Sequence, residues 1–459
     1  MIAKVSPTLC APSWGEDADM SHWQEPEALP QRLEEQRKRI EQLARARGLD
    51  FFETRFVMLD ATDVNAVAAY GGFPVRHPSW RFGMEWERLE KGRTWGLSKI
   101  YELVVNNDPA WAYLVRGNSE MEQKLVMAHV YGHVDFFKHN IWFQPTDRSM
   151  VDTMASHGAL VRALVDEHGH DAIENFMDVA LSLDNLVDPW LPMRERLRTP
   201  QHAAVRAGGP ALDLETVRRR SMVVEEHLPT FDVLGYLVDR APLLAWQREL
   251  LRMVRAEAHY FMPQRLTKIM NEGWASYWHS KLLTGGVLNA SEIIDFADCH
   301  SGATAAPAGR LNPYKLGIEL YRHAERNGLD IFRLRRAHHD VTLLDELVDE
   351  EFAHSVELFA PRKGPDGKLV SWRETKELLL RELSNGGLPR IELVEDNHLQ
   401  RGELLLRHHH DGRDLDSAAA QRTLAGLAAV WGRGVHLDTE LKGTPMRHSA
   451  APGALRAAS

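Results

Sequence analysis

The chain has 459 residues, enough for two or three domains or for one large core with an appendage. Its residues are 44% hydrophobic and 26% charged, an ordinary globular composition, and its formal net charge of −10 argues against a general nucleic-acid binder. The sequence contains no run of about 18 or more apolar residues and no secretory pattern at its N-terminus, so neither a membrane span nor a signal is expected. Its two cysteines, Cys10 and Cys299, are far apart and favour a reducing, cytoplasmic setting.

The N-terminal part of the chain predicts an arm, a helix and a β-hairpin. Residues 1–25 are polar and contain proline, which predicts a flexible arm. Apolar spacing and i,i+4 charge pairs predict an exposed helix over residues 30–49. Residues 53–60, "ETRFVMLD", alternate like a strand. Two apolar runs around the turn-forming "NNDP" then predict a β-hairpin over residues 99–115.

The next predicted helix carries two histidines. Ser119 and Glu122 form a capping-box pattern that begins this helix. Within "AHVYGHVDFFKHN", His129 and His133 are four residues apart, so they lie on one helix face in a spacing that suits one tetrahedral metal ion. Asn140 follows seven residues later and is expected near that face. Two core histidines satisfied by hydrogen bonds are the structural alternative.

A second predicted helix places an acid among apolar residues. In "IMNEGWASYWH", Glu272 and His279 are seven residues apart and share a face with Ser276. A glutamate in so apolar a segment needs a metal ion, a cation or a hydrogen-bond donor. A buried Glu–Arg or Glu–His pair is the alternative. Asn271, next to Glu272, is also expected in the pocket.

The two helices together predict a metal site. His129, His133 and Glu272 supply the ligand set of a catalytic zinc, which leaves one position for water or substrate. His279 is expected as a fourth ligand or as an electrophile near a developing oxyanion, and His300 as a loop residue that enters the pocket. A hairpin, a two-histidine helix and a later Asn-Glu helix resemble the layout of gluzincin metallopeptidases.

Val130 distinguishes this pattern from the H-E-x-x-H helix of hydrolytic zinc enzymes. The residue after the first histidine of that helix is the general base, and valine cannot accept a proton. A surrogate base is expected from Glu102 on the hairpin, or from Glu272 if Glu272 is not a ligand. Otherwise the site binds without hydrolysing.

The C-terminal part predicts a separate small domain. Strand-like and helical segments alternate after about residue 340, which is typical of an α+β domain, and "SVELFA" at residues 355–360 is among the predicted strands. "RLRRAHHD" at residues 333–340 predicts a solvated linker helix. His408, His409 and His410 alternate faces on a predicted strand, so they cannot all chelate one ion. The expected division is an arm, a mainly helical zincin-like domain, a small α+β domain and a disordered tail, over residues 1–25, 26–335, 336–442 and 443–459.

At these segments the chain resembles the SpoVR family, the bacterial stage V sporulation protein R group. The resemblance is carried by "AHVYGHVDFFKHN", "PQRLTKIMNEGWASYWH", "LNPYKLG", "HHDVTLLDE" and "RGELLLRHHHDGRDLD". It implies a cytoplasmic protein linked to spore-cortex, and hence peptidoglycan, formation, or to stress physiology in bacteria that do not sporulate. It also implies association with a serine protein kinase and a von Willebrand-type protein. Within the family pattern, Val130 is a shared trait.

Two hypotheses for the function remain open. The first is a regulator or scaffold built on a metallopeptidase-like fold that binds partner proteins. The second is a metal-dependent hydrolase that acts on a peptide or peptidoglycan amide bond with a non-standard base. Zinc is the expected cofactor, and a peptide or peptidoglycan-derived molecule the expected ligand.

Overall fold

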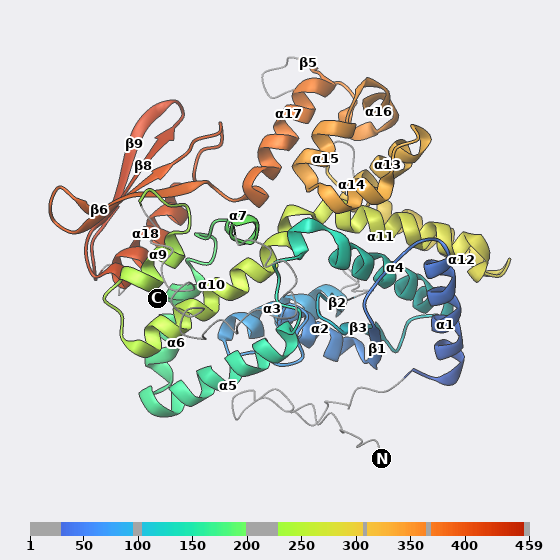
Figure 1. The fold of residues 1–459 in the computed structure, drawn as a ribbon, viewed down its shortest axis with the longest axis horizontal. Coiled ribbons are helices and arrows are strands. Elements are labelled where there is room, and N and C mark those ends of the chain that lie inside the picture. Colours follow the sequence, from blue (N-terminus) through green and yellow to red (C-terminus); the bar gives the residue numbers. More distant parts are fainter. Residues whose placement is uncertain (1–28, 95–102, 199–227, 306–309, 364–368, 454–459) are drawn as a thin grey trace, which may run out of the picture. The chain divides into compact units, whose positions relative to one another are not determined.

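The computed structural model describes residues 29–94, 103–198, 228–305, 310–363 and 369–453 (Figure 1). Within these ranges the chain is mainly helical with small sheets, which confirms the predicted α+β class. It forms two compact units, and each joins two stretches of sequence: Met1–Glu167 with Leu266–Leu380, and His168–Arg265 with Arg381–Ser459. No described helix combines the length and apolar character that crossing a membrane requires.

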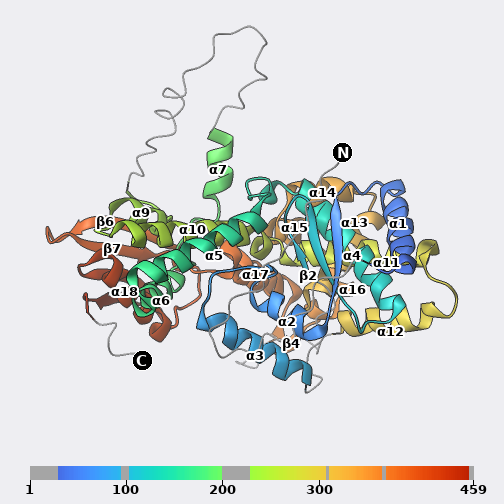
Figure 2. The ribbon, with the colours of Figure 1, turned by 90° about the horizontal axis from the view of Figure 1, so that it is seen from below.

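The first unit consists of helices around a small mixed sheet. Its helices are α1 (Gln31–Ala46), α2 (Ala61–Ala69), α3 (Trp80–Thr94), α4 (Glu120–His139), α5 (Met150–His168), α11 (Lys268–Leu282), α12 (Glu292–Thr304), α13 (Pro313–Arg326), α14 (Ile331–Ala337), α15 (Asp340–Leu347), α16 (Glu350–Ser355) and α17 (Trp372–Leu383). Its strands are β1 (Thr54–Leu59), β2 (Leu103–Val105), β3 (Ala110–Val115), β4 (Arg362–Lys363) and β5 (Leu369–Val370). The sheet order is β1-β3-β2, and the antiparallel pairing of β2 with β3 confirms the predicted hairpin. This sheet lies beside α4 (Figure 2).

Helix α4 begins at a side-chain capping box and ends at Asn140. The hydroxyl of Ser119 accepts a hydrogen bond from the Glu122 backbone N–H at 3.2 Å, and the Glu122 carboxylate accepts from the Ser119 N–H at 2.7 Å. This capping box confirms the predicted helix start. At the other end the Asn140 backbone N–H donates to the Phe136 carbonyl. The Asn140 side-chain NH2 donates to the carbonyls of Arg335 and His338, and its side-chain oxygen accepts from the Trp142 N–H.

Two helices of the first unit are buried on every side. All residues from Val126 to Phe137 on α4, and from Ile269 to His279 on α11, are buried. A helix that is apolar all round belongs in the interior of a protein, which explains why these segments carry so few charges. The charges that they do carry therefore need partners inside the core.

Glycines allow α4, α11 and α13 to pack at very short distances. A Cβ atom on Gly132 of α4 would lie 2.7 Å from Ala275 Cα on α11, and one on Gly273 would lie 2.4 Å from Gly317 Cα on α13. Both distances are too short for a Cβ contact, so only glycine permits the helices to approach this closely. The same close approach brings the side chains of α11 against the histidines of α4.

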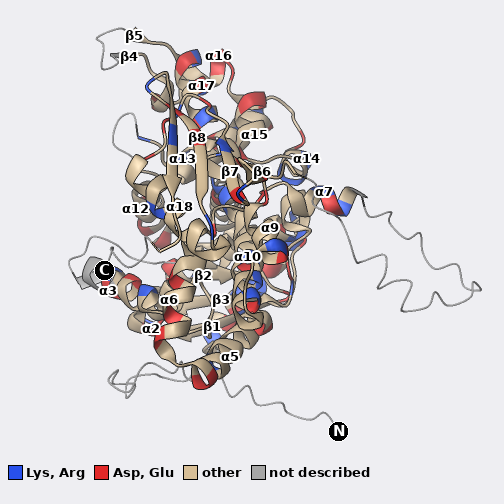
Figure 3. Cartoon of the chain, turned by 90° about the vertical axis from the view of Figure 1, so that its left-hand side faces the viewer, with Lys and Arg blue, Asp and Glu red and all other residues tan. Residues whose placement is uncertain are grey.

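The second unit packs helices against a four-stranded sheet. Its helices are α6 (His170–Leu181), α7 (Leu191–Arg198), α9 (Val233–Arg240), α10 (Ala245–Leu266) and α18 (Ser417–Trp431). Its strands are β6 (Ile391–His398), β7 (Glu403–His408), β8 (Val435–Leu441) and β9 (Thr444–Ala450), in the order β6-β7-β8-β9. Parallel pairing of β7 with β8 is made through the crossover helix α18. Helix α10 carries both arginines and glutamates (Figure 3).

The boundaries of the units differ from the expected linear division at residue 335. Residues 168–265 form one unit with the C-terminal sheet, and within it Thr230 and Leu393 exchange backbone hydrogen bonds of 2.8 and 3.0 Å. These two residues are far apart in sequence, so no local pattern could reveal their pairing. The expected arm at residues 1–25 lies outside the described residues.

Three local predictions are wrong. Residues 444–450, expected in the disordered tail, form β9 because they pair with β8 along its whole length. The predicted strand at residues 355–360 is instead the end of α16 and a 3₁₀ turn at Glu357–Phe359, because Asp349 caps a helix ahead of it. The predicted solvated helix at residues 333–340 includes Arg335, which is 3% exposed.

Candidate metal centre

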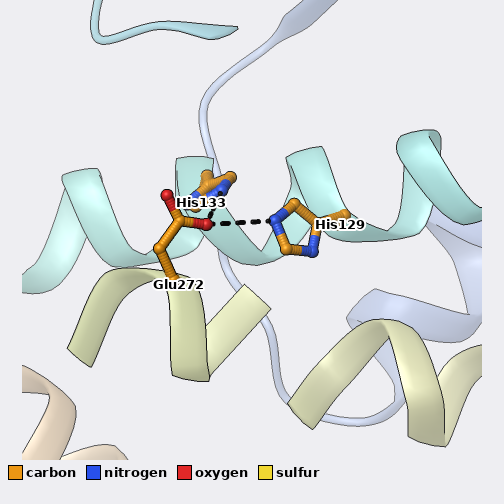
Figure 4. A group of neighbouring side chains, drawn as sticks. All are labelled: His129, His133 and Glu272. Carbon is orange, nitrogen blue, oxygen red and sulfur yellow. Dashed lines mark ion pairs between the residues drawn. The ribbon is translucent and has the colours of Figure 1, made fainter. Parts of the chain in front are cut away.

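Three side chains from α4 and α11 converge inside the first unit (Figure 4). The Oε2 atom of Glu272 lies 3.5 Å from the Nε2 atom of His129 and 3.5 Å from the Nε2 atom of His133. All three side chains are buried, and one potential ligand atom from each lies within 4.8 Å of the others. The predicted ligand set is therefore brought together.

The spacing of these atoms fits a metal ion better than direct hydrogen bonds. An N–H···O hydrogen bond is about 2.9 Å long, whereas tetrahedral ligands at zinc distances of about 2.0–2.1 Å lie about 3.3–3.4 Å apart. The two 3.5 Å separations are close to that tetrahedral edge. Glu272 Oε2 is buried and has no hydrogen-bond partner among the described residues. A buried carboxylate oxygen without a hydrogen-bond donor needs a cation as its partner.

The charge of Glu272 is stabilised by its neighbours. Burial alone would raise the pKa of this carboxyl, but His133, His129 and the ammonium group of Lys268 outweigh burial and hold the pKa well below its usual range. Lys268 Nζ lies 2.5 Å from Glu272 Oε1, while Oε2 faces the two histidines. Glu272 is therefore an ionised carboxylate, which is the form that binds a metal ion.

Asn271 sets the orientation of His133. The side-chain oxygen of Asn271 lies 2.9 Å from His133 Nδ1, and an amide oxygen can only accept, so this nitrogen carries the proton. His133 Nε2 is then left with its lone pair toward Glu272. Metal-binding histidines usually have their second nitrogen held in this way. Asn271 is thus a positioning residue for the site.

A chain of imidazoles leads from His129 toward α12. His129 Nδ1 lies 2.9 Å from His279 Nδ1, and His279 Nε2 lies 3.0 Å from His300 Nδ1. If His129 Nδ1 donates to His279 and His279 Nε2 donates to His300, the lone pair of His129 Nε2 points toward Glu272. Burial and the adjacent imidazoles lower the pKa of His279 well below its usual range, and burial also lowers that of His300. Both imidazoles are therefore neutral, as the chain requires.

The structure changes the expected roles of His279 and His300. His279 contacts the Nδ1 atom of His129, on the opposite edge of the ring from Glu272, so it acts through His129 and does not complete the ligand set. His300 lies on α12 rather than in a loop, and its ring stacks on Phe296. Both residues are close to the site, but they lie on the side of the His129 ring that faces away from Glu272.

Three other expected site residues are not among the three converging side chains. Asn140 is the C-cap of α4, so its side chain is engaged with backbone groups and does not face the ligands. Ser276 is buried on α11, and its hydroxyl is not one of the three converging groups. Glu102 lies outside the described residues. Val130 is completely buried, so the position after the first histidine belongs to the apolar core.

One side chain that the sequence did not single out, Asp340, holds the start of α11 in place. The carboxylate of Asp340 accepts hydrogen bonds of 2.8 Å from the backbone N–H groups of Ile269 and Met270, at the start of the helix that carries Glu272. Burial raises the pKa of Asp340 to about 7, although these N–H groups act in the opposite direction. Asp340 lies in "HHDVTLLDE", but its partners are about 70 residues away in sequence, so the motif alone does not indicate this role.

A buried ion pair explains why Arg335, within the segment expected to be solvated, is buried. Arg335 Nη1 lies 3.1 Å from Asp135 Oδ2, and Trp274 Nε1 donates to the same oxygen at 2.8 Å. The Asp50 N–H donates to the other carboxylate oxygen. This network joins α4, α11 and α14, and its members Asp135 and Trp274 are each two residues from a residue of the metal-type site.

Tyr314 lies at the edge of the site. The side chain of Asn312 caps α13 by accepting from the backbone N–H groups of Tyr314 and Lys315. The ring of Tyr314 stacks on His129 with centroids 6.2 Å apart, and Lys268 Nζ lies 6.0 Å from the centre of the Tyr314 ring. The segment "LNPYKLG" therefore contributes an aromatic wall to the site.

Comparisons with known proteins cover most of the chain. The family model described as SpoVR like protein matches residues 27–383, and the model of the SpoVR-like C-terminal domain matches residues 389–442. The uncharacterized protein YcgB of Escherichia coli (strain K12) is 31% identical over 320 residues, which are 62% of this chain and 62% of that protein. The match thus spans about three fifths of the length of this curated relative. No solved structure matches the chain.

Proposed function

The chain belongs to the SpoVR family, and we propose that it is a regulator or scaffold whose core holds one divalent metal ion. The proposed ligands are His129, His133 and Glu272, and zinc is the proposed metal because it favours a tetrahedral set of two imidazoles and one carboxylate. The observation that carries this proposal is the pair of 3.5 Å separations between Glu272 Oε2 and the two Nε2 atoms.

Val130 favours regulation over hydrolysis. It occupies the position of the general base in H-E-x-x-H enzymes, and it is buried among apolar side chains. A buried valine neither accepts a proton nor positions a water molecule. Asp135 and Asp340, two other buried acids of this unit, are bonded to Arg335 and to the start of α11.

The family resemblance supports a physiological setting for this scaffold. We propose a role in sporulation, through spore-cortex peptidoglycan formation, or in a stress response in the cytoplasm. A serine protein kinase and a von Willebrand-type protein are the proposed partners. In this proposal the metal ion keeps α4 and α11 together, so metal loading controls the surface that the partners recognise.

Metal analysis of purified protein tests the proposal. We expect about one equivalent of zinc per chain in the wild type, and loss of the metal in His129→Ala and Glu272→Ala variants, because each removes one of three ligands. His139→Ala is the matched control, since His139 lies on the same helix but bonds to Asp50. Less than about a tenth of an equivalent in the zinc-supplemented wild type, or metal retained by His129→Ala, would contradict the assignment.

The three-ligand set also supports a second candidate function, a metal-dependent amide hydrolase. Three protein ligands leave one coordination position, where a bound zinc ion would supply Lewis acidity. Lys268, whose side chain is more than half exposed, lies beside the buried Glu272 and supplies a donor at the edge of the site. In this function a peptide or peptidoglycan amide is the substrate, and Glu102 is the proposed surrogate base.

Hydrolysis can be tested separately from metal binding. Zinc-loaded protein is incubated with purified peptidoglycan and with peptides, and new amino groups are quantified. Release by the wild type that is lost in Glu102→Gln, with zinc content unchanged, would support the hydrolase. Full zinc loading without any release would leave the regulator as the function.

A further inference from the structure

The motif "RGELLLRHHHDGRDLD" lies far from the metal-type site in sequence and belongs to the second unit. Together with α18 and the sheet, it lines a partly open cavity of about 330 Å³. Cavities that bind small molecules in proteins start at about 300 Å³. One water molecule occupies about 30 Å³ in the liquid. If each non-hydrogen atom of a ligand takes a similar volume, this cavity has room for a molecule of about eleven non-hydrogen atoms.

The walls of this cavity are apolar. Four leucines of β7, α18 and β8 form most of the walls and are almost completely buried: Leu406, Leu424, Leu427 and Leu437. Ile391 of β6 also lines the cavity. An apolar molecule would gain the free energy of leaving water without displacing a polar partner from these walls. The body of a ligand is therefore expected to be hydrocarbon.

Two lining side chains present acceptor atoms that have no donor among the described residues. If the hydroxyl of Thr439 donates to the Glu440 carbonyl, 3.4 Å away, it accepts from His408 Nδ1, which lies 2.9 Å away. Nε2 of the buried His408 is then the unprotonated nitrogen, and it has no hydrogen bond to any described residue. Asn185 adds a buried side-chain oxygen that also lacks a hydrogen-bond partner among the described residues. A ligand must therefore bring donors.

Carboxylates dominate the polar part of the lining. Asp411, Asp414 and Asp416 line the cavity with one cationic side chain, Arg413, whose guanidinium is already bound to Asp411. Hydrogen bonds hold this loop in shape: His410 Nε2 lies 3.0 Å from Asp414 Oδ1, and the Lys442 N–H donates to the same carboxylate. Asp416 Oδ1 accepts from the Ala419 N–H, so all three carboxylates are held in place. Carboxylates fixed in this way attract a cation and repel an anion.

We propose that this cavity binds a small organic cation, a primary amine attached to an apolar body of about ten carbon atoms. The ammonium group donates to His408 Nε2 and to the carboxylates, and the body packs against the leucines. The site is independent of the metal centre, since it lies wholly within the second unit. It gives this unit the means to sense an amine.

Three phenylalkyl probes with the same number of carbon atoms test the charge preference. The full chain is titrated calorimetrically with 4-phenylbutylamine, 4-phenylbutanol and 4-phenylbutyrate, which carry a cationic, a neutral and an anionic head. We expect saturable binding of one amine per chain, with a Kd at least about tenfold lower than that of the acid and lower than that of the alcohol. An alcohol or acid that binds as tightly as the amine overturns the proposal, as does the absence of saturable amine binding.

Two variants on α18 locate the binding. Ala420 lines the cavity, so Ala420→Leu fills part of it and should abolish amine binding. Ala418 lies on the same helix but is exposed and outside the lining, so Ala418→Leu is the matched control and should bind as the wild type does. Unchanged binding by Ala420→Leu would place the amine elsewhere and overturn the proposal.

Asp414→Asn provides a test that changes charge but not volume. We expect this variant to lose most of the preference for the amine over the alcohol, because one of three carboxylates is neutralised. A preference equal to that of the wild type would contradict the assigned position of the ammonium group. This variant keeps the proposal testable if Ala420→Leu does not fold.

Discussion

Asn271 and His133 illustrate how one neighbouring residue prepares a ligand. Asn271 accepts a hydrogen bond from His133 Nδ1, and this contact leaves Nε2 of His133 as the nitrogen that faces Glu272. The histidine pair was recognisable from its spacing, whereas the role of Asn271 depends on a contact across 138 residues of sequence.

Replacing Asn271 should weaken zinc binding without removing a ligand. Asn271→Leu loses the acceptor for His133 Nδ1, so we expect the Kd for zinc to rise about 10- to 100-fold. Asn271→Asp keeps an acceptor oxygen and should bind zinc at least as tightly as the wild type. Competition with a chromophoric chelator measures both constants. Equal affinity in Asn271→Leu would show that His133 needs no such support.

The neighbours of each imidazole ring also decide which histidines face Glu272. His129 and His133 share a helix face with one turn between them, but His279 contacts the opposite edge of the His129 ring. Spacing along a helix predicts which residues share a face. It does not predict which nitrogen of a ring meets a neighbouring helix, because that depends on the packing of the two helices.

At the scale of secondary structure elements, the site depends on the closeness of α4 and α11. Gly132 lies between the two histidines in sequence, and a Cβ atom there would lie 2.7 Å from Ala275 Cα. The backbone of α11 cannot move out of the way without shifting Glu272, which lies on the same helix. Stability and metal affinity are therefore linked at this contact.

A methyl group at this contact should therefore have two effects. We expect Gly132→Ala to lower the free energy of unfolding by about 1–3 kcal/mol through overpacking, and also to weaken zinc binding, because Glu272 is pushed away from the histidines. Urea unfolding and zinc competition measure the two effects. Gly302→Ala on α12 is the control: no atom lies within 4 Å of its Cβ position, so it should be neutral or stabilising by up to about 1 kcal/mol. A Gly132→Ala variant as stable as Gly302→Ala would contradict this account of the packing.

At the scale of the whole molecule, buried ionisable groups determine how stability depends on pH. In the second unit, burial lowers the pKa of His259 to about 4, and neither ring nitrogen has a hydrogen-bond partner among the described residues. The unfolded chain binds a proton at this residue near pH 6.5. Between pH 6.5 and about 4 unfolding therefore takes up a proton, so stability falls as the pH is lowered. Above pH 6.5 neither state is protonated and this contribution vanishes.

The variant His259→Phe should remove this part of the acid sensitivity. We expect its melting temperature to fall less than that of the wild type between pH 6.5 and 4, with no difference in slope above pH 7. Calorimetric or circular dichroism melts across this pH range measure the difference. Identical pH profiles for the two proteins would mean that His259 is protonated in the folded state.

Several features of this protein follow from its sequence alone. The capping box at Ser119, the hairpin around residues 106–109, the histidine pair and the mainly helical α+β class are set by interactions between residues close in the chain. Such local hydrogen bonds and periodic apolar positions can be read directly from the order of residues. The family motifs belong to the same category, because they are continuous segments.

Tertiary structure alone decided the rest. The sequence did not reveal that the Asn140 side chain bonds to the Arg335 carbonyl, that Arg335 is buried against Asp135, or that residues 168–265 join the C-terminal sheet. Each depends on partners far away in the chain, and burial of a polar group is favourable only when such a partner is present. The metal-type site combines both sources: the spacing of His129 and His133 comes from one helix, and their closeness to Glu272 comes from the packing of two.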